Sequence, residues 1–113
     1  MYAQYVPWVY MTPLPEPTED GWCVSFVRSH GFEEYNGDAH TWKRFINALE
    51  PIVGSAIVLD EGTDGHVALI TAVSSGSLDL IEQNFEGLGI VSTRSLDRFS
   101  TSIVGYIHPK SQK

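Results

Sequence analysis

Cys23 is the residue of this sequence best suited to nucleophilic chemistry, and it is the only cysteine among 113 residues. It follows the acidic, glycine-containing turn "TEDG" and opens an apolar run. A thiol reacts as the thiolate, which a helix N-terminus favours through its partial positive charge and its N–H groups. The same N–H groups can stabilise an oxyanion on a substrate carbonyl. If a helix begins near Gly21, Cys23 is placed for acyl-transfer chemistry.

His66 is the candidate general base for this thiol. It follows "DEGTDG" and opens the run "HVALITAV", which predicts a position at the start of a buried strand, beside a turn. A thiol–imidazole pair needs a third group that orients the ring. The next strand supplies "IEQNF", and because side chains alternate across a strand, Glu82 and Asn84 lie on one face. Both side chains could reach the His66 ring.

Each of these four residues also has a purely structural interpretation. A cysteine among apolar residues commonly packs as a small hydrophobic side chain. His66 could be a solvated turn residue, and Glu82 and Asn84 could face water on an edge strand. The alternative is a papain-like cysteine hydrolase. The order of the candidates fits it, because the cysteine is on a helix, the histidine on a strand and Glu/Asn on the next strand.

The sequence contains little that would hold a metal or a redox cofactor. A single cysteine excludes an internal disulfide and a Cys-x-x-Cys pair. The turn residues Asp60, Glu61 and Asp64 could hold a calcium ion, but they lack the alternating oxygen-ligand spacing of a dedicated calcium loop. We therefore expect no cofactor, with calcium as the alternative. The remaining histidines show no metal-ligand spacing and are expected to be surface or structural residues: His30, His40 and His108.

The acidic composition limits the partners that this chain can bind. Seven Lys and Arg against fourteen Asp and Glu give a net charge of −7, and no basic cluster is present. This balance argues against phosphate-mediated nucleic-acid binding and against electrostatic docking on anionic membranes or acidic wall polymers. No stretch approaches the roughly 18 to 20 apolar residues of a membrane span. The N-terminus also lacks the features of a signal peptide, so we do not expect general secretory export unless a signal was removed.

The first part of the chain predicts an arm followed by two helices. Residues 1–19 are rich in proline and aromatic residues and should form an extended arm that packs on the domain, lines a groove or meets a partner. Residues 22–30 have the pattern of a short helix, with Thr18 or Asp20 as its cap. A second helix is expected over about 39–49. The buried faces of the two helices are expected to comprise Cys23, Phe26 and Val27 in the first, and Trp42, Phe45, Ile46 and Leu49 in the second.

The rest of the chain predicts a sheet. Five β-branched, apolar runs are separated by turn residues: "SAIVLD", "HVALITAV", "LDLIEQNF", "GIVSTRSL" and "SIVGYIH". Two helices followed by about five closely spaced strands indicate a single α+β domain, over residues 20–110, with the helices packed on one face of an antiparallel sheet.

The chain resembles the CHAP domain, the cysteine- and histidine-dependent amidohydrolase/peptidase of peptidoglycan hydrolases and phage lysins. The resemblance covers about residues 20–109 and consists of segments in the family's order. They are "GWCVSFV", "NGDAHTW", "PIVGSAIVL", "DGHVALITAV", "IEQNF" and "VGYIHP".

The resemblance implies a papain-like fold of the NlpC/CHAP type, in which Cys23 is the nucleophile and His66 the general base. Glu82 would orient His66, and Asn84 would orient a group or polarise the substrate carbonyl. The implied activity is cleavage of amide bonds in peptidoglycan, as an N-acetylmuramoyl-L-alanine amidase or an endopeptidase. The implied setting is a phage lysin or a virion-associated enzyme that reaches the cell wall after lysis or as part of a phage particle.

Two differences from the family pattern bear on these expectations. Many members carry glutamine before the nucleophile, where this chain has Trp22, so another donor or backbone N–H groups would have to stabilise the oxyanion. The family's Gly-Asp after the proline segment is Gly54-Ser55 here, which affects only the turn. The alternative function is a structural or binding CHAP-like component of a phage or secretion assembly, with little activity and a protein partner docked through the arm.

Overall fold

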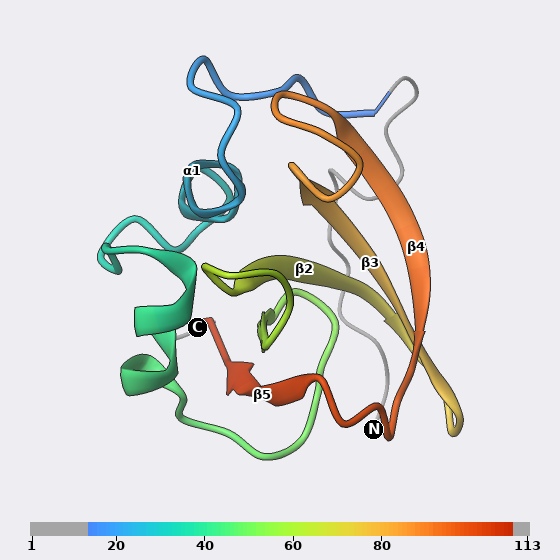
Figure 1. Ribbon diagram of the computed structural model, residues 1–113. Helices are drawn as coiled ribbons and strands as arrows, with labels where there is room; N and C mark the ends of the chain where they lie inside the picture. The colour runs from blue at the N-terminus through green and yellow to red at the C-terminus, as the bar shows by residue number, and fades with distance from the viewer. Residues whose placement is uncertain (1–13, 110–113) are drawn as a thin grey trace.

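Five antiparallel strands form one curved sheet in the computed structural model, which describes residues 14–109 (Figure 1). The order of the strands across the sheet is β4-β3-β2-β1-β5. Residues 1–13 of the expected arm lie outside the described residues. The strands agree with the five predicted runs: β1 (Ala56–Leu59), β2 (His66–Val73), β3 (Ser77–Gln83), β4 (Val91–Asp97) and β5 (Ile103–Ile107).

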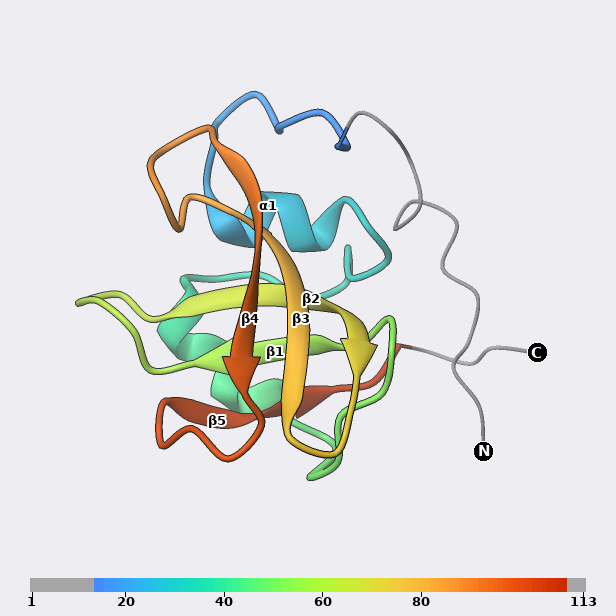
Figure 2. The same ribbon diagram turned by 90° about the vertical axis from the view of Figure 1, so that its right-hand side faces the viewer.

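Two short helical segments precede the sheet and pack on the same side of it, as Figure 1 and, turned by 90°, Figure 2 show. The first is the α-helix α1 (Cys23–Arg28), which contacts β2 and β3. The second, η2 (Ala39–Phe45), is a 3-10 helix against β1, β2 and β5. Within residues 14–109, no helix has the length and apolar character needed to cross a membrane.

The prediction of a second α-helix over 39–49 was wrong in type and in length. The chain leaves the helix at Ile46, whose ψ of 127° is extended, and Ala48 then forms an isolated antiparallel bridge with Tyr106. The backbone hydrogen bonds of residues 47 and 48 therefore go to β5. Leu49, expected in the apolar stripe, is 85% exposed. Pairing with a distant strand overrode the local helical pattern.

The predicted cap of the first helix also differs from the structure. Trp22 occupies the N-cap position, and no side chain caps the helix there. Asp20 instead binds the same turn from outside, because its carboxylate accepts the Trp22 N–H and the Ser25 hydroxyl. This hydrogen bonding, led by Ser25, lowers the pKa of Asp20.

The core has two parts, one on each face of the sheet. The part under the helices includes the predicted face of α1 together with Trp42 and inward residues of β1, β2 and β3. The other part fills the opposite face and comprises Ile57, Leu59, Ala68, Ile70, Leu78, Leu80 and Tyr106. Because the first five residues of β2 are buried on both faces, its first residue, His66, can lie at the junction between α1 and the sheet with little exposure to water.

Candidate active site

Cys23 is the first residue of α1 and is 8% exposed. The chain reaches it through Gly21, which has a φ of +77° and whose carbonyl accepts the Gly89 N–H. A Cβ atom on residue 21 would lie 2.7 Å from the backbone nitrogen of Gly89. Glycine is therefore required for the loop before the cysteine to pack on the loop after β3, and this packing fixes where the helix begins.

Gln83 holds the same loop from the sheet, a role that the sequence did not reveal. Its side chain is fully buried, and its amide nitrogen donates to the Trp22 carbonyl at 2.8 Å and to the Thr18 hydroxyl at 2.6 Å. Its amide oxygen accepts the Thr18 N–H at 2.8 Å. The alternation of "IEQNF" had placed Gln83 on the face opposite Glu82, and that face is the one that α1 covers.

His66 and Glu82 form a buried hydrogen bond of 2.8 Å between Nε2 of the ring and Oε1 of the carboxylate. His66 is 6% exposed and Glu82 is 0% exposed. Leu69 pairs with Ile81 in the antiparallel register of β2 and β3. Continuing this register places Glu82 opposite Ala68, so the side chains of Glu82 and His66 are diagonal neighbours on one face. Because Nε2 bonds to Glu82, Nδ1 is the ring nitrogen left for the Cys23 thiol.

The surroundings of His66 favour its protonated form. Burial acts to lower the pKa of His66, but hydrogen bonds and charges from Cys23 and Glu82 outweigh burial and raise it from 6.5 to about 9. At neutral pH the ring is therefore an imidazolium between the sulfur of Cys23 and the carboxylate of Glu82. This is the charge state in which the ring can give a proton to a leaving group.

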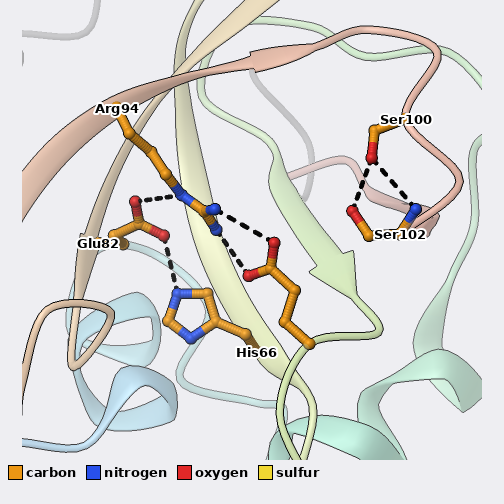
Figure 3. A network of polar contacts seen from close by, with 6 residues as sticks. His66, Glu82, Arg94, Ser100 and Ser102 are labelled. Carbon is orange, nitrogen blue, oxygen red and sulfur yellow. Dashed lines mark hydrogen bonds and ion pairs between the residues drawn. The ribbon is translucent and has the colours of Figure 1, made fainter.

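Arg94 and Glu61 extend this arrangement beyond Glu82. Figure 3 shows Arg94 beside Glu82. Arg94 donates from Nε to Oε2 of Glu82 at 2.8 Å, and its two terminal nitrogens donate to the Glu61 carboxylate at 2.7 and 3.1 Å. Neither residue was predicted for the site. Glu61 had been considered only among the turn residues of a possible calcium site, and the position of Arg94 depends on the register between β3 and β4.

An open cleft of about 640 Å³ lies over these residues. Cys23, His66 and Asn84 all line it, with Trp22 and Phe85 among the other lining residues. Asn84 follows the end of β3 with a φ of +71°, which ends the simple alternation of the strand. The structure thus brings Cys23, His66 and Glu82 into one connected group, and Asn84 borders the same cleft.

The predicted calcium alternative concerned Asp60, Glu61 and Asp64. Both carboxylate oxygens of Glu61 bind Arg94, and the carbonyl of Asp64 accepts the His40 N–H at 2.8 Å. In the part of the chain that the structure describes, no group of three or more His, Cys, Asp or Glu side chains could hold a metal ion.

Comparison with known proteins agrees with this geometry. The sequence profile of the CHAP domain matches residues 15–84, a segment that contains all four predicted site residues. An N-acetylmuramoyl-L-alanine amidase domain-containing protein of Staphylococcus aureus is 32% identical over an alignment of 87 residues, and the match covers 66% of this chain and 14% of that protein. The chain therefore spans about one seventh of the length of this curated relative.

Two solved structures resemble the fold. The crystal structure of an N-acetylmuramoyl-L-alanine amidase from Staphylococcus aureus has a TM-score of 0.60 and 27% identity, over 78% of this chain and 32% of that one. The crystal structure of Ly7917 has a TM-score of 0.58 over 79% of this chain and 53% of that one; its 18% identity shows the fold alone. Since the profile matches more than half of the sequence, the chain belongs to the CHAP domain family.

Proposed function

We propose that this chain is a cysteine-dependent hydrolase of amide bonds in bacterial peptidoglycan. The observation that supports this function best is the connected group of Cys23, His66 and Glu82 at an open cleft. Membership of the CHAP family and the amidase names of its Staphylococcus aureus relatives agree with it.

The first half of the proposed reaction is acylation of the thiol. The Cys23 thiolate attacks the amide carbonyl, and the carbonyl π electrons move to oxygen to give a tetrahedral oxyanion. When the oxyanion collapses, the carbon–nitrogen bond breaks, and the His66 imidazolium gives its proton to the leaving amine. Glu82 keeps the ring oriented throughout, because its Oε1 accepts the Nε2 hydrogen. The products of this half are an amine and a thioester at Cys23.

The second half is hydrolysis of the thioester. His66 is now neutral and takes a proton from a water molecule in the cleft as that water attacks the thioester carbonyl. The carbon–sulfur bond breaks, the carboxylic acid product leaves, and the thiolate–imidazolium pair is restored. Atoms and charge balance over the cycle, which consumes one water for each amide bond cleaved.

The oxyanion donors that we propose are backbone N–H groups in the first turn of α1, which have no acceptor within their own helix. Gln83 is not a suitable donor, because its amide nitrogen already donates to Thr18 and to the carbonyl of Trp22. Asn84, which lines the cleft, is the side chain that we propose to assist at the substrate carbonyl. On this account Trp22, in place of the family's glutamine, does not prevent catalysis.

The bond that we propose is the one between the glycan's muramic acid and L-alanine, because the two Staphylococcus aureus relatives are named as amidases of that bond. Cleavage within the peptides is the alternative outcome. The place of action that we propose is the bacterial cell wall, reached after lysis or as part of a phage particle, as the family resemblance implies.

The test uses purified protein and insoluble peptidoglycan, with mass spectrometry of the released fragments. We expect the wild type to release fragments, and Cys23→Ala and His66→Ala to release none while keeping a wild-type circular dichroism spectrum. His40→Ala is the matched control, since this histidine is exposed and is not among the residues that line the cleft. Release by Cys23→Ala at the wild-type rate would refute the thiol mechanism. A folded wild type that binds peptidoglycan without cleaving it would favour the structural alternative.

A further inference from the structure

Arg94 is the part of the site that neither the family match nor the proposed reaction explains. It lies on β4, outside the matched segment 15–84, and β4 is an edge strand of the sheet. In the register of β3 and β4, Leu80 pairs with Arg94 and Glu82 pairs with Ser92. Directly paired residues share a face of a sheet, so Arg94 and Glu82 are diagonal neighbours on one face.

The guanidinium of Arg94 lies between two carboxylates and uses its whole fork of donors. Nε binds Glu82 at 2.8 Å, and the two terminal nitrogens bind Glu61 at 2.7 and 3.1 Å. Burial acts to lower the pKa of Arg94, but the hydrogen bonds to Glu61 and Glu82 raise it overall. A lysine could not reproduce this geometry, because one ammonium group lacks the planar fork that reaches two carboxylates at once.

The contact with Arg94 determines how the Glu82 carboxylate is oriented. Glu82 is fully buried, and its two oxygens have different partners, His66 at Oε1 and Arg94 at Oε2. Without the second partner, a buried carboxylate would lose a charge-assisted hydrogen bond and could rotate away from the ring. The guanidinium thus holds the plane of the carboxylate that in turn orients His66.

The other end of the guanidinium connects the site to the rim of the cleft. Glu61 lines the cleft and lies in the loop that joins β1 to β2, five residues before His66 in the sequence. Phe85 is another lining residue, and the centroid of its ring lies 3.7 Å from the guanidinium carbon of Arg94. Arg94 therefore contacts a side chain from the loop before β2, one from β3 and one from the loop after β3.

We propose that Arg94 is a positioning residue that holds the Glu82 carboxylate against His66. Glu61 holds the guanidinium in place, and this ion pair connects the loop between β1 and β2 to the sheet. This inference rests on the proposed cysteine hydrolase function. It assigns Arg94 no contact with the substrate. Its effect should therefore appear in the rate of the chemical step and should pass through Glu82.

The first test compares Arg94→Lys with the wild type on soluble peptidoglycan fragments. We expect kcat to fall about tenfold and KM to stay within about twofold, because the charge remains but the orientation is lost. Arg98→Lys is the matched control, since Arg98 contacts Ser74 and Glu50 instead of the site. A kcat for Arg94→Lys within twofold of the wild type would overturn the proposal, as would a loss that Arg98→Lys shows equally.

The second test is a double-mutant cycle with the rate of Cys23 alkylation by iodoacetamide as its readout. If Arg94 acts through Glu82, the effect of Arg94→Lys should shrink to less than twofold in a Glu82→Gln background. Equal effects in the two backgrounds would overturn the proposal. Glu61→Gln is the milder variant, and we expect it to slow alkylation by a smaller factor than Arg94→Lys does. An alkylation rate unchanged by Glu61→Gln would contradict the role of Glu61.

These readouts separate a failure of this inference from a failure of the proposed function. A wild type that does not cleave peptidoglycan, with Cys23 unreactive, refutes the function. A wild type that cleaves, together with an Arg94→Lys variant that behaves like the wild type, refutes only the positioning role.

Discussion

Replacing Glu82 with glutamine should change the pH range of activity as well as its rate. Glu82 is fully buried and accepts hydrogen bonds from both His66 and Arg94. Glutamine keeps the shape but offers one acceptor oxygen and places an NH₂ group where a donor already points. One of the two partners must then lose its acceptor.

The size of the effect follows from the pKa of His66. Its rise from 6.5 to about 9 corresponds to about 3 kcal/mol of preference for the imidazolium. Cys23 and Glu82 together produce this rise. If Glu82 supplies about half of it, Glu82→Gln should move the alkaline limit of activity down by about one pH unit. Breaking a buried ion pair should also cost about 3 kcal/mol of stability at neutral pH.

The assay is fragment release from peptidoglycan between pH 5 and pH 10, a range that contains both the ordinary pKa of histidine and the raised pKa of His66. Urea unfolding is measured at neutral pH. Asp79→Asn is the matched control, because Asp79 lies on the same strand but is exposed, and the contact described for its carboxylate is with the Ser95 hydroxyl. An alkaline limit that stays at its wild-type position in Glu82→Gln would refute the electrostatic role given to this carboxylate.

Three further predictions concern the surroundings of the site. Because the pKa of His66 is raised to about 9, its contribution to stability should be complete below pH 6.5 and should disappear as pH rises through about 9, which urea unfolding across this range measures. Gly21→Ala should lose about 2 kcal/mol in chemical denaturation, because its Cβ would meet backbone; Gly31→Ala, also at positive φ but in open space, should lose less. Gln83→Leu should remove the side-chain donor of the Trp22 carbonyl and both Gln83 hydrogen bonds to Thr18, and we expect a loss of about 1–3 kcal/mol in thermal unfolding together with slower fragment release.

Most of the sheet could be predicted from sequence because its strands carry a strong local pattern. Each of the five β-branched runs became a strand, and turn residues separate them. The second helix could not be predicted in the same way. Its apolar spacing is helical, but the segment ends where Ala48 pairs with Tyr106, a residue far along the chain. Such pairing leaves no trace in a local pattern.

The candidate site was predictable where function depends on residue type and order. Cys23, His66, Glu82 and Asn84 were selected as candidates because thiol chemistry requires a nucleophile, a base and an orienting group, and their catalytic roles stay a prediction. Arg94 could not be found, because nothing in the sequence gives the register that brings it diagonal to Glu82.

Gln83 and Glu61 were missed for a different reason. A polar residue on a face covered by a helix, or in a turn rich in acidic residues, has a common structural interpretation. The three-dimensional structure shows that Gln83 binds the Trp22 carbonyl and that Glu61 binds Arg94 through both oxygens.

The most direct test of the account is the rate at which iodoacetamide alkylates Cys23 at mildly acidic pH, followed by intact-protein mass spectrometry. The single cysteine of the chain makes each mass increment unambiguous. If Cys23 forms an ion pair with the His66 imidazolium, the wild type should react at pH 6 at least about 100-fold faster than a free thiol. His66→Ala should lose this advantage while remaining folded. A wild type that reacts as slowly as His66→Ala would contradict the central claim that Cys23 is an activated nucleophile.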